Sequence, residues 1–124
     1  MNNIFKVLVI DDSPFIFKAV KKALVSHGFE VVGHAENGKL GLEMFEKLMP
    51  DVITLDITMP IMDGMETAAN LFKKNPNINV VMLSAMGDEV LIESARKIGV
   101  KHFLPKPFKA EELLTAVNTM INKI

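Results

Sequence analysis

The sequence predicts a doubly wound α/β fold, in which helices cover both faces of a five-stranded parallel sheet. Five short runs of β-branched and aliphatic residues alternate with five stretches of helical periodicity. The expected strands are residues 6–10, 30–33, 52–55, 79–83 and 102–104. The first, third and fourth are almost continuously apolar, which is typical of parallel strands covered on both faces. Strict alternation of strand and helix favours right-handed crossovers in such a sheet.

The stretches between and after these strands carry apolar residues at helical spacing. The expected buried stripes are Ile16, Val20, Ala23 and Leu24; Leu42, Phe45 and Met49; Met65, Ala68, Ala69 and Phe72; Leu91, Ala95 and Ile98; and Leu113, Val117, Met120, Ile121 and Ile124. Ser13 before Pro14 predicts an N-cap and a proline in the first helical turn. Gly28 and Gly99 are expected to end the first and fourth helices.

Size and composition favour one domain that spans residues 1–124. Because the chain has no cysteine, it has no disulfide framework and no thiolate metal site. No apolar run approaches the roughly 20 residues of a membrane span, and the first residues do not resemble a signal peptide. The net charge of −1 does not indicate the basic surface that nucleic-acid binding requires. We therefore expect a cytoplasmic monomer without a nucleic-acid or membrane partner.

Polar side chains are expected at the carboxyl ends of four strands. Asp11 and Asp12 end the first strand, Asp56 the third and Ser84 the fourth, and Lys106 follows the fifth. In open parallel sheets the functional crevice lies beyond these ends, where the strand order reverses. Periodicity does not fix the strand order. The flavodoxin-like order 2-1-3-4-5 is adopted because it brings these polar groups together.

Three converging carboxylates predict a divalent cation, because they repel one another strongly when no cation is present. Mg²⁺ suits the site since it prefers hard oxygen ligands and commonly shares its coordination shell with a phosphate. An ionised carboxylate beside the metal is then able to attack phosphorus and form an acyl phosphate. Lys106 and the Ser84 hydroxyl are placed to neutralise and bind phosphoryl oxygens. Each of these residues has an ordinary structural explanation when it is considered alone. Only their occurrence together favours a site for phosphoryl transfer.

Four stretches resemble the response-regulator receiver family, and together they cover essentially the whole chain. They are VLVIDDS at 7–13, DVITLDITMPIMDG at 51–64, VVMLSAMG at 80–87 and HFLPKPF at 102–108. The resemblance implies the flavodoxin-like (βα)5 fold with strand order 2-1-3-4-5 and a single receiver domain. It also implies a signalling domain that catalyses its own phosphorylation and dephosphorylation, and not a turnover enzyme.

The resemblance implies a role for each residue that matches a motif position. Asp56 is implied as the phosphoacceptor and Asp12 as a direct metal ligand. Asp11 is expected to act on the metal through water, and the backbone carbonyl of Thr58 is expected as a further ligand. Lys106 is similar to the family's lysine, and together with Asp56 and Ser84 it forms the expected catalytic set.

Three further positions belong to the expected switch. Ser84 stands where the family has Thr or Ser, and Phe103 where it has an aromatic switch residue, often Tyr. A cis peptide bond is expected before Pro107. His27, His34 and His102 lack metal-ligand spacing and are expected to be structural or surface residues.

The expected phosphodonor is a sensor histidine kinase of the chemotaxis type, and the stretches DITMPIMDG and SAMG favour that pathway. A flagellar motor switch protein or a phosphatase is the expected partner of the phosphorylated form. Two alternatives stay open, namely a phosphorelay intermediate and the receiver segment of a longer transcription regulator. A flavodoxin-like FMN binder is a more remote alternative, because Asp11 and Asp12 would repel its phosphate. A haloacid-dehalogenase-type hydrolase would need an acid two residues after Asp56, where this chain has Thr58.

Overall fold

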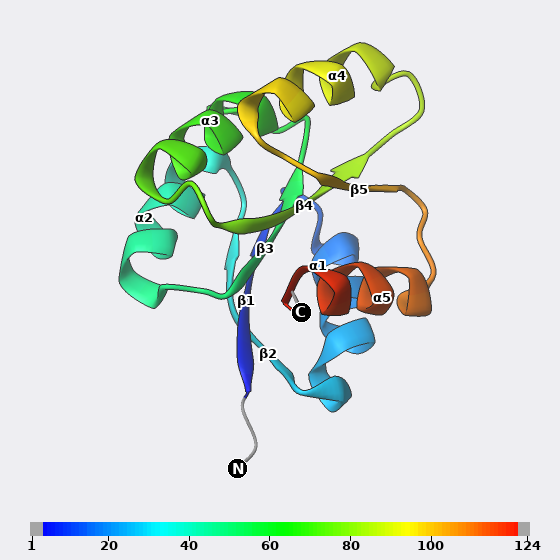
Figure 1. The fold of residues 1–124 in the computed structure, drawn as a ribbon. Coiled ribbons are helices and arrows are strands. Elements are labelled where there is room, and N and C mark those ends of the chain that lie inside the picture. The colour runs from blue at the N-terminus through cyan, green and yellow to red at the C-terminus, as the bar shows by residue number, and fades with distance from the viewer. Residues whose placement is uncertain (1–3, 122–124) are drawn as a thin grey trace.

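A computed structural model describes residues 4–121 and confirms the predicted fold class and strand order. Five parallel strands form one sheet in the order β2-β1-β3-β4-β5. The elements are β1 (Phe5–Ile10), α1 (Pro14–Leu24), η1 (Val25–His27), β2 (Phe29–Ala35), α2 (Gly38–Leu48), β3 (Val52–Asp56), α3 (Gly64–Lys74), β4 (Asn79–Ser84), α4 (Glu89–Ile98), β5 (His102–Pro105) and α5 (Ala110–Ile121). Figure 1 shows α1 and α5 on one face of the sheet, and α2, α3 and α4 on the other.

Two apolar cores lie on the two faces of the sheet because side chains alternate along each strand. In β1, Val7 and Val9 face the core beneath α1 and α5, whereas Leu8 and Ile10 face the core beneath α2, α3 and α4. All four side chains are fully buried. The central strands are therefore rigidly held, and so are the residues at their carboxyl ends.

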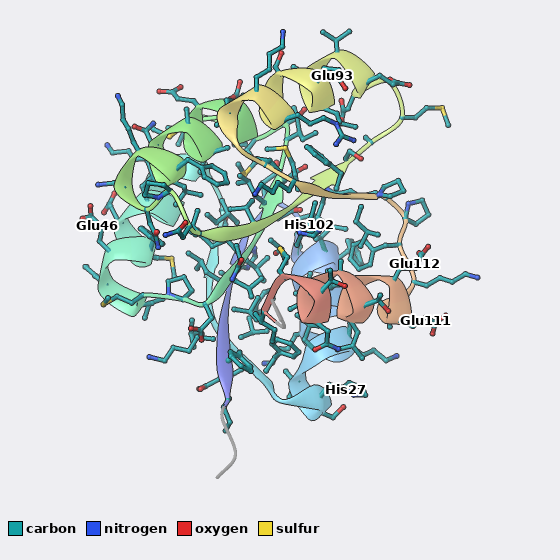
Figure 2. All side chains as sticks on the ribbon, viewed as in Figure 1. His27, Glu46, Glu93, His102, Glu111 and Glu112 are labelled. Carbon is teal, nitrogen blue, oxygen red and sulfur yellow. The ribbon has the colours of Figure 1, made fainter. Side chains whose placement is uncertain are left out.

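The helix ends follow the predicted capping chemistry. The Ser13 hydroxyl accepts a hydrogen bond from the Ile16 amide at 3.3 Å, and Pro14 begins α1. Gly28 has a φ of 90°, a left-handed conformation that favours glycine, and it ends η1. His27 lies on η1, at the end of the sheet opposite the carboxyl ends of the strands (Figure 2).

Four local expectations were wrong. Leu91 was placed in a buried stripe but is 37% exposed. Met49 was placed in a buried stripe but is 75% exposed, because α2 ends at Leu48 and Met49 adopts a φ of 47°. Ala69 is exposed, and the neighbouring Leu71 is buried in its place. β2 continues two residues past the predicted end, to Ala35. Ile124 lies outside the described residues. Within the described part of the chain, no helix is long and apolar enough to cross a membrane.

Candidate functional site

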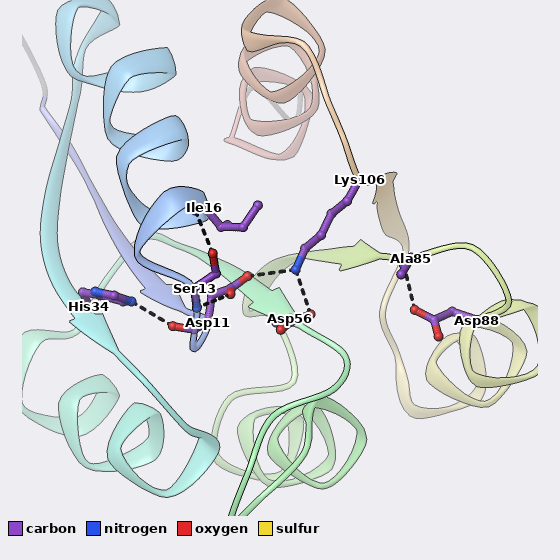
Figure 3. A network of polar contacts seen from close by, with 8 residues as sticks. All are labelled: Asp11, Ser13, Ile16, His34, Asp56, Ala85, Asp88 and Lys106. Carbon is purple, nitrogen blue, oxygen red and sulfur yellow. Dashed lines mark hydrogen bonds and ion pairs between the residues drawn. The ribbon is translucent and has the colours of Figure 1, made fainter.

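The predicted polar residues gather where the central strands end. Asp11 follows β1, Asp56 is the last residue of β3, and Lys106 follows β5. β1 and β3 are neighbours in the sheet, so their carboxyl ends meet. Figure 3 shows the Lys106 side chain reaching across from the β5–α5 loop to both carboxylates.

Asp11 is completely buried, and its polar atoms each have a partner. Its Oδ2 lies 3.2 Å from Lys106 Nζ, and its Oδ1 accepts a hydrogen bond from the Ser13 amide at 2.9 Å. The Asp11 amide donates to Ala35 O at 2.9 Å, and the Asp11 carbonyl lies 2.8 Å from His34 Nε2. A buried charge needs this degree of pairing to be tolerated.

Asp56 is 8% exposed, and its Oδ1 lies 3.0 Å from Lys106 Nζ. Burial and the charge of Asp11 raise the pKa of the Asp56 carboxyl above its ordinary value, although the hydrogen bond from Lys106 acts in the opposite direction. Burial also disfavours the Lys106 ammonium. The hydrogen bond to Asp56 and the charge of Asp11 outweigh that effect, so the pKa of Lys106 is raised. The site therefore carries more negative charge than its lysine offsets.

These residues fit a divalent cation. Asp11, Asp12 and Asp56 each offer a carboxylate oxygen, and these oxygens lie within 4.8 Å of one another. The donor set is entirely hard oxygen, which suits Mg²⁺. A divalent charge would also relieve the repulsion that raises the pKa of Asp56. Asp12 is exposed, so one side of the cluster is open to solvent.

Ser84 and the loop after β5 are joined to each other. Ser84 is buried at the end of β4, and its carbonyl accepts a hydrogen bond from the Lys106 amide at 2.7 Å. The peptide bond between Lys106 and Pro107 is cis. The β4 and β5 ends therefore form one edge of the site, with Ser84 and Lys106 side by side in adjacent strand ends.

Thr58 follows β3, and Phe103 lies in β5, so both come from elements that supply residues to the site. Thr58 is exposed two residues after Asp56, and the role of its carbonyl stays a prediction. Phe103 is half-buried in β5 and packs against the core beneath α2, α3 and α4. The guanidinium of Arg96 lies 4.9 Å from the centre of its ring. Phe103 is thus held from the α4 side of the sheet.

The sequence did not reveal the role of Gly64 in packing α3 against Asp56. Asp63 and Gly64 together are typical of an ordinary turn. The Gly64 amide donates to Ile57 O at 2.7 Å, and a Cβ added here would lie 2.1 Å from the carbonyl oxygen of Asp56. Only glycine, which has no Cβ, allows these two stretches of backbone to lie so close together. Asp63 caps α3 by accepting a hydrogen bond from the Glu66 amide at 3.0 Å. The start of α3 is therefore packed directly against the backbone of Asp56.

Two other contacts at the site also escaped the sequence pattern. The Asp88 carboxylate accepts a hydrogen bond from the Ala85 amide at 2.7 Å, which orders the loop after Ser84 (Figure 3). His34 was expected to be a structural or surface residue, and it makes a structural contact with the Asp11 carbonyl. The sequence pattern gave no signal for this contact, because it depends on the register that pairs His34 with Val9 near the end of β1.

Comparisons with known proteins agree with this geometry. Residues 7–118 match the family model of the response regulator receiver domain. The chemotaxis protein CheY of Listeria monocytogenes is 42% identical over 112 residues, which span 90% of this chain and 94% of that protein. The chemotaxis protein CheY of Bacillus subtilis is 38% identical over 117 residues, covering 94% and 98% of the two chains.

A solved structure of the CheX–CheY–BeF3–Mg²⁺ complex from Borrelia burgdorferi superposes on this chain with a TM-score of 0.89. Its sequence identity is 34%, and the match covers 96% of this chain and 90% of that chain. The similarity in sequence and in structure therefore extends over nearly the whole of the fold, including the carboxyl ends of all five strands.

Proposed function

Since this chain belongs to the response regulator receiver domain family, we propose that Asp56 accepts a phosphoryl group from a histidine kinase in a Mg²⁺-dependent step. The observation that carries the proposal is the convergence of Asp11, Asp12 and Asp56 on one oxygen-rich cluster beside Lys106. The proposal treats residues 1–124 as one receiver domain located in the cytoplasm.

In the proposed reaction, an ionised Asp56 oxygen attacks the phosphorus of a phosphohistidine on the kinase. A P–O bond forms on Asp56, the P–N bond breaks, and the imidazole of the kinase leaves with the electron pair of that bond. Bound Mg²⁺ would neutralise charge on the phosphoryl oxygens and on the carboxylates of Asp11, Asp12 and Asp56. The Thr58 carbonyl is a further proposed ligand.

Lys106 and Ser84 bind the transferred group in this proposal. The Lys106 ammonium already contacts Asp56 at 3.0 Å and would move its hydrogen bond to a phosphoryl oxygen. The Ser84 hydroxyl would donate to another oxygen from the adjacent strand end. Because no acidic residue follows two positions after Asp56, the acyl phosphate is hydrolysed without a dedicated general acid/base, and the domain acts as a switch.

The switch is proposed to run through β4 and β5. Movement of Ser84 toward the phosphoryl group leaves space into which Phe103 turns, and this changes the surface formed by α4, β5 and α5. The two CheY relatives described above are chemotaxis proteins. We assign this chain to the same kind of pathway, with a chemotaxis histidine kinase as donor and a flagellar motor switch protein or a phosphatase as partner. A phosphorelay intermediate and a transcription-regulator receiver are the alternatives.

Intact mass measurement after exposure to acetyl phosphate and Mg²⁺ tests the phosphorylation step. The wild-type chain should gain one phosphoryl group, and Asp56→Asn should gain none. Asp63→Asn makes the same chemical change at a helix cap, where Asn is as good as Asp, and should be phosphorylated normally. An adduct that persists in Asp56→Asn would mean that the acceptor is another residue.

A pull-down with a flagellar motor switch protein tests the proposed pathway. Binding should be stronger after phosphorylation of the wild-type chain, and the same treatment should not strengthen binding of Asp56→Asn. If a histidine-containing phosphotransfer protein removes the phosphoryl group and becomes phosphorylated itself, the phosphorelay alternative is favoured.

A further inference from the structure

We propose that His34 is a positioning residue for the metal site, because its imidazole holds the peptide that joins Asp11 to Asp12. The inference rests on the proposed function for the identity of the metal as Mg²⁺. His34 lies in β2, an edge strand that supplies no carboxylate to the cluster. Its effect on the metal must therefore pass through the backbone that directly follows β1.

The peptide between Asp11 and Asp12 is held at its carbonyl oxygen. That oxygen lies 2.8 Å from His34 Nε2 (Figure 3). Since a carbonyl oxygen only accepts hydrogen bonds, Nε2 carries the hydrogen and donates it. The carbonyl of Asp11 and the amide nitrogen of Asp12 belong to one planar unit. Fixing the carbonyl therefore fixes the position from which the Asp12 side chain starts.

Asp12 depends on this constraint more than the other two carboxylates do. Asp11 and Asp56 are buried and both contact Lys106. The Asp12 carboxylate is exposed and has no hydrogen-bond or ion-pair partner among residues 4–121. Only its backbone position is restrained, so a tilt of the peptide would shift its range of positions away from the other two oxygens of the cluster.

The imidazole is itself held in place. Its ring stacks on Phe17 of α1 with centres 4.4 Å apart and planes 3° from parallel. The Phe17 amide donates to Ser13 O at 3.2 Å, and the Ser13 amide donates to Asp11 Oδ1 at 2.9 Å. Phe17, Ser13, Asp11 and His34 therefore form a closed ring of contacts around the Asp11–Asp12 peptide. Partners of this kind orient metal ligands and affect metal affinity.

Calorimetric titration of Mg²⁺ into the unphosphorylated chain tests the inference with four variants. His34→Phe keeps an aromatic ring on Phe17 but removes the donor, so its Mg²⁺ Kd should rise about tenfold. His34→Gln keeps an N–H donor but loses the ring that stacks on Phe17, so its Kd should rise by only about threefold. Phe17→Leu removes the stacking partner and should raise the Kd by about threefold. His27→Phe repeats the first change on η1, far from the site, and should bind Mg²⁺ normally.

A second readout separates positioning from chemistry. The Mg²⁺ concentration for half-maximal phosphorylation by acetyl phosphate should shift in His34→Phe by the same factor as the Kd. The extent of phosphorylation at saturating Mg²⁺ should equal that of wild type, because Asp56 and Lys106 are unchanged. Unfolding curves recorded in EDTA show whether each variant is folded.

The inference is overturned if folded His34→Phe binds Mg²⁺ like wild type, if His34→Gln is as weak as His34→Phe, or if wild type binds no Mg²⁺. If His34→Phe does not fold, an unchanged affinity of Phe17→Leu overturns it, and the expected rise supports it. Wild type that binds Mg²⁺ but never takes up a phosphoryl group contradicts the proposed function alone. Normal phosphorylation with equal affinities in all variants contradicts this inference alone.

Discussion

At the scale of single residues, the acidic cluster works against folding when no metal is bound. Burial and the charge of Asp11 raise the pKa of Asp56, so the folded chain binds a proton at Asp56 more tightly than the unfolded chain does. For such a group, stability falls as pH rises from the ordinary aspartate pKa through the raised one. At neutral pH, ionised Asp56 therefore costs folding free energy.

We predict that Asp56→Asn is more stable than wild type at neutral pH in the absence of Mg²⁺. The difference should shrink as pH falls below the ordinary aspartate pKa, because both states of the wild-type chain are then protonated at this position. Thermal unfolding in EDTA at several pH values measures it. Asp63→Asn controls for the chemical change alone. A destabilised Asp56→Asn at neutral pH would mean that the ion pair with Lys106 outweighs burial.

Two buried threonines give a matched pair of predictions. Thr54 is fully buried in β3, and its hydroxyl has no hydrogen-bond partner among the described residues. Thr54→Val should therefore raise stability by about 1 kcal/mol, which corresponds to a rise of about 4 °C in Tm. Thr67 is equally buried, but its hydroxyl donates to Asp63 O at 2.7 Å, so Thr67→Val should lose about 1 kcal/mol.

Urea unfolding of these two variants, beside wild type, measures the difference in the free energy of unfolding. Phosphorylation by acetyl phosphate should be unchanged in Thr54→Val, because this side chain points into the core beneath α1 and α5. A loss of stability in Thr54→Val would show that its hydroxyl has a partner, such as a buried water molecule, in solution.

At the scale of elements, the start of α3 controls where Asp56 stands. A Cβ on Gly64 would lie 2.1 Å from the Asp56 carbonyl oxygen and 2.7 Å from the Ile57 Cα, both backbone atoms that have no freedom to rotate away. We predict that Gly64→Ala costs about 2 kcal/mol of stability and also slows phosphorylation, because relief of the clash must displace the backbone of Asp56.

Gly41→Ala is the control for this prediction. Its Cβ would lie 2.6 Å from the end of the Ile10 side chain, which is able to move, so a smaller loss of stability is expected. Its phosphorylation rate should equal that of wild type. A Gly64→Ala chain that is destabilised but phosphorylated at the normal rate would show that α3 and Asp56 move independently.

The sequence predicted the elements and the residues at their ends because both follow from local patterns. Apolar runs located β1, β3 and β4, and the carboxyl ends of parallel strands necessarily deliver Asp11, Asp56 and Ser84 to one edge. Local patterns did not determine the length of β2 or the exposure of Met49. An edge strand continues as far as its neighbour offers hydrogen bonds, and α2 ends where the residue after it takes a left-handed conformation.

The partners of the site residues were harder to predict, since they come from segments distant in sequence. His34 is 23 residues from Asp11, and Lys106 is 95 residues from it. The lysine was expected because it belongs to a motif. The histidine was not, because its contact depends on the register of β2 against β1 and on the packing of Phe17, neither of which the sequence pattern fixes.

At the scale of the whole molecule, the proposed metal site connects distant parts of the chain. Its carboxylates come from β1 and β3, and Lys106 follows β5, so the cluster exists only when the sheet is assembled. A cation that binds this cluster binds the folded chain and not the unfolded one. Mass action then adds to folding stability a free energy that grows with the ratio of Mg²⁺ concentration to Kd.

We predict that Mg²⁺ at 100 times its Kd raises the free energy of unfolding by about 2.7 kcal/mol and raises Tm accordingly. The same addition should have a much smaller effect on Asp12→Asn, which loses one of the three carboxylates. NaCl at matched ionic strength separates specific binding from screening of the repulsion between Asp11 and Asp56. If NaCl raises the Tm of wild type as much as Mg²⁺ does, the cluster is a screened acidic patch, and the proposed metal-dependent step loses its structural basis.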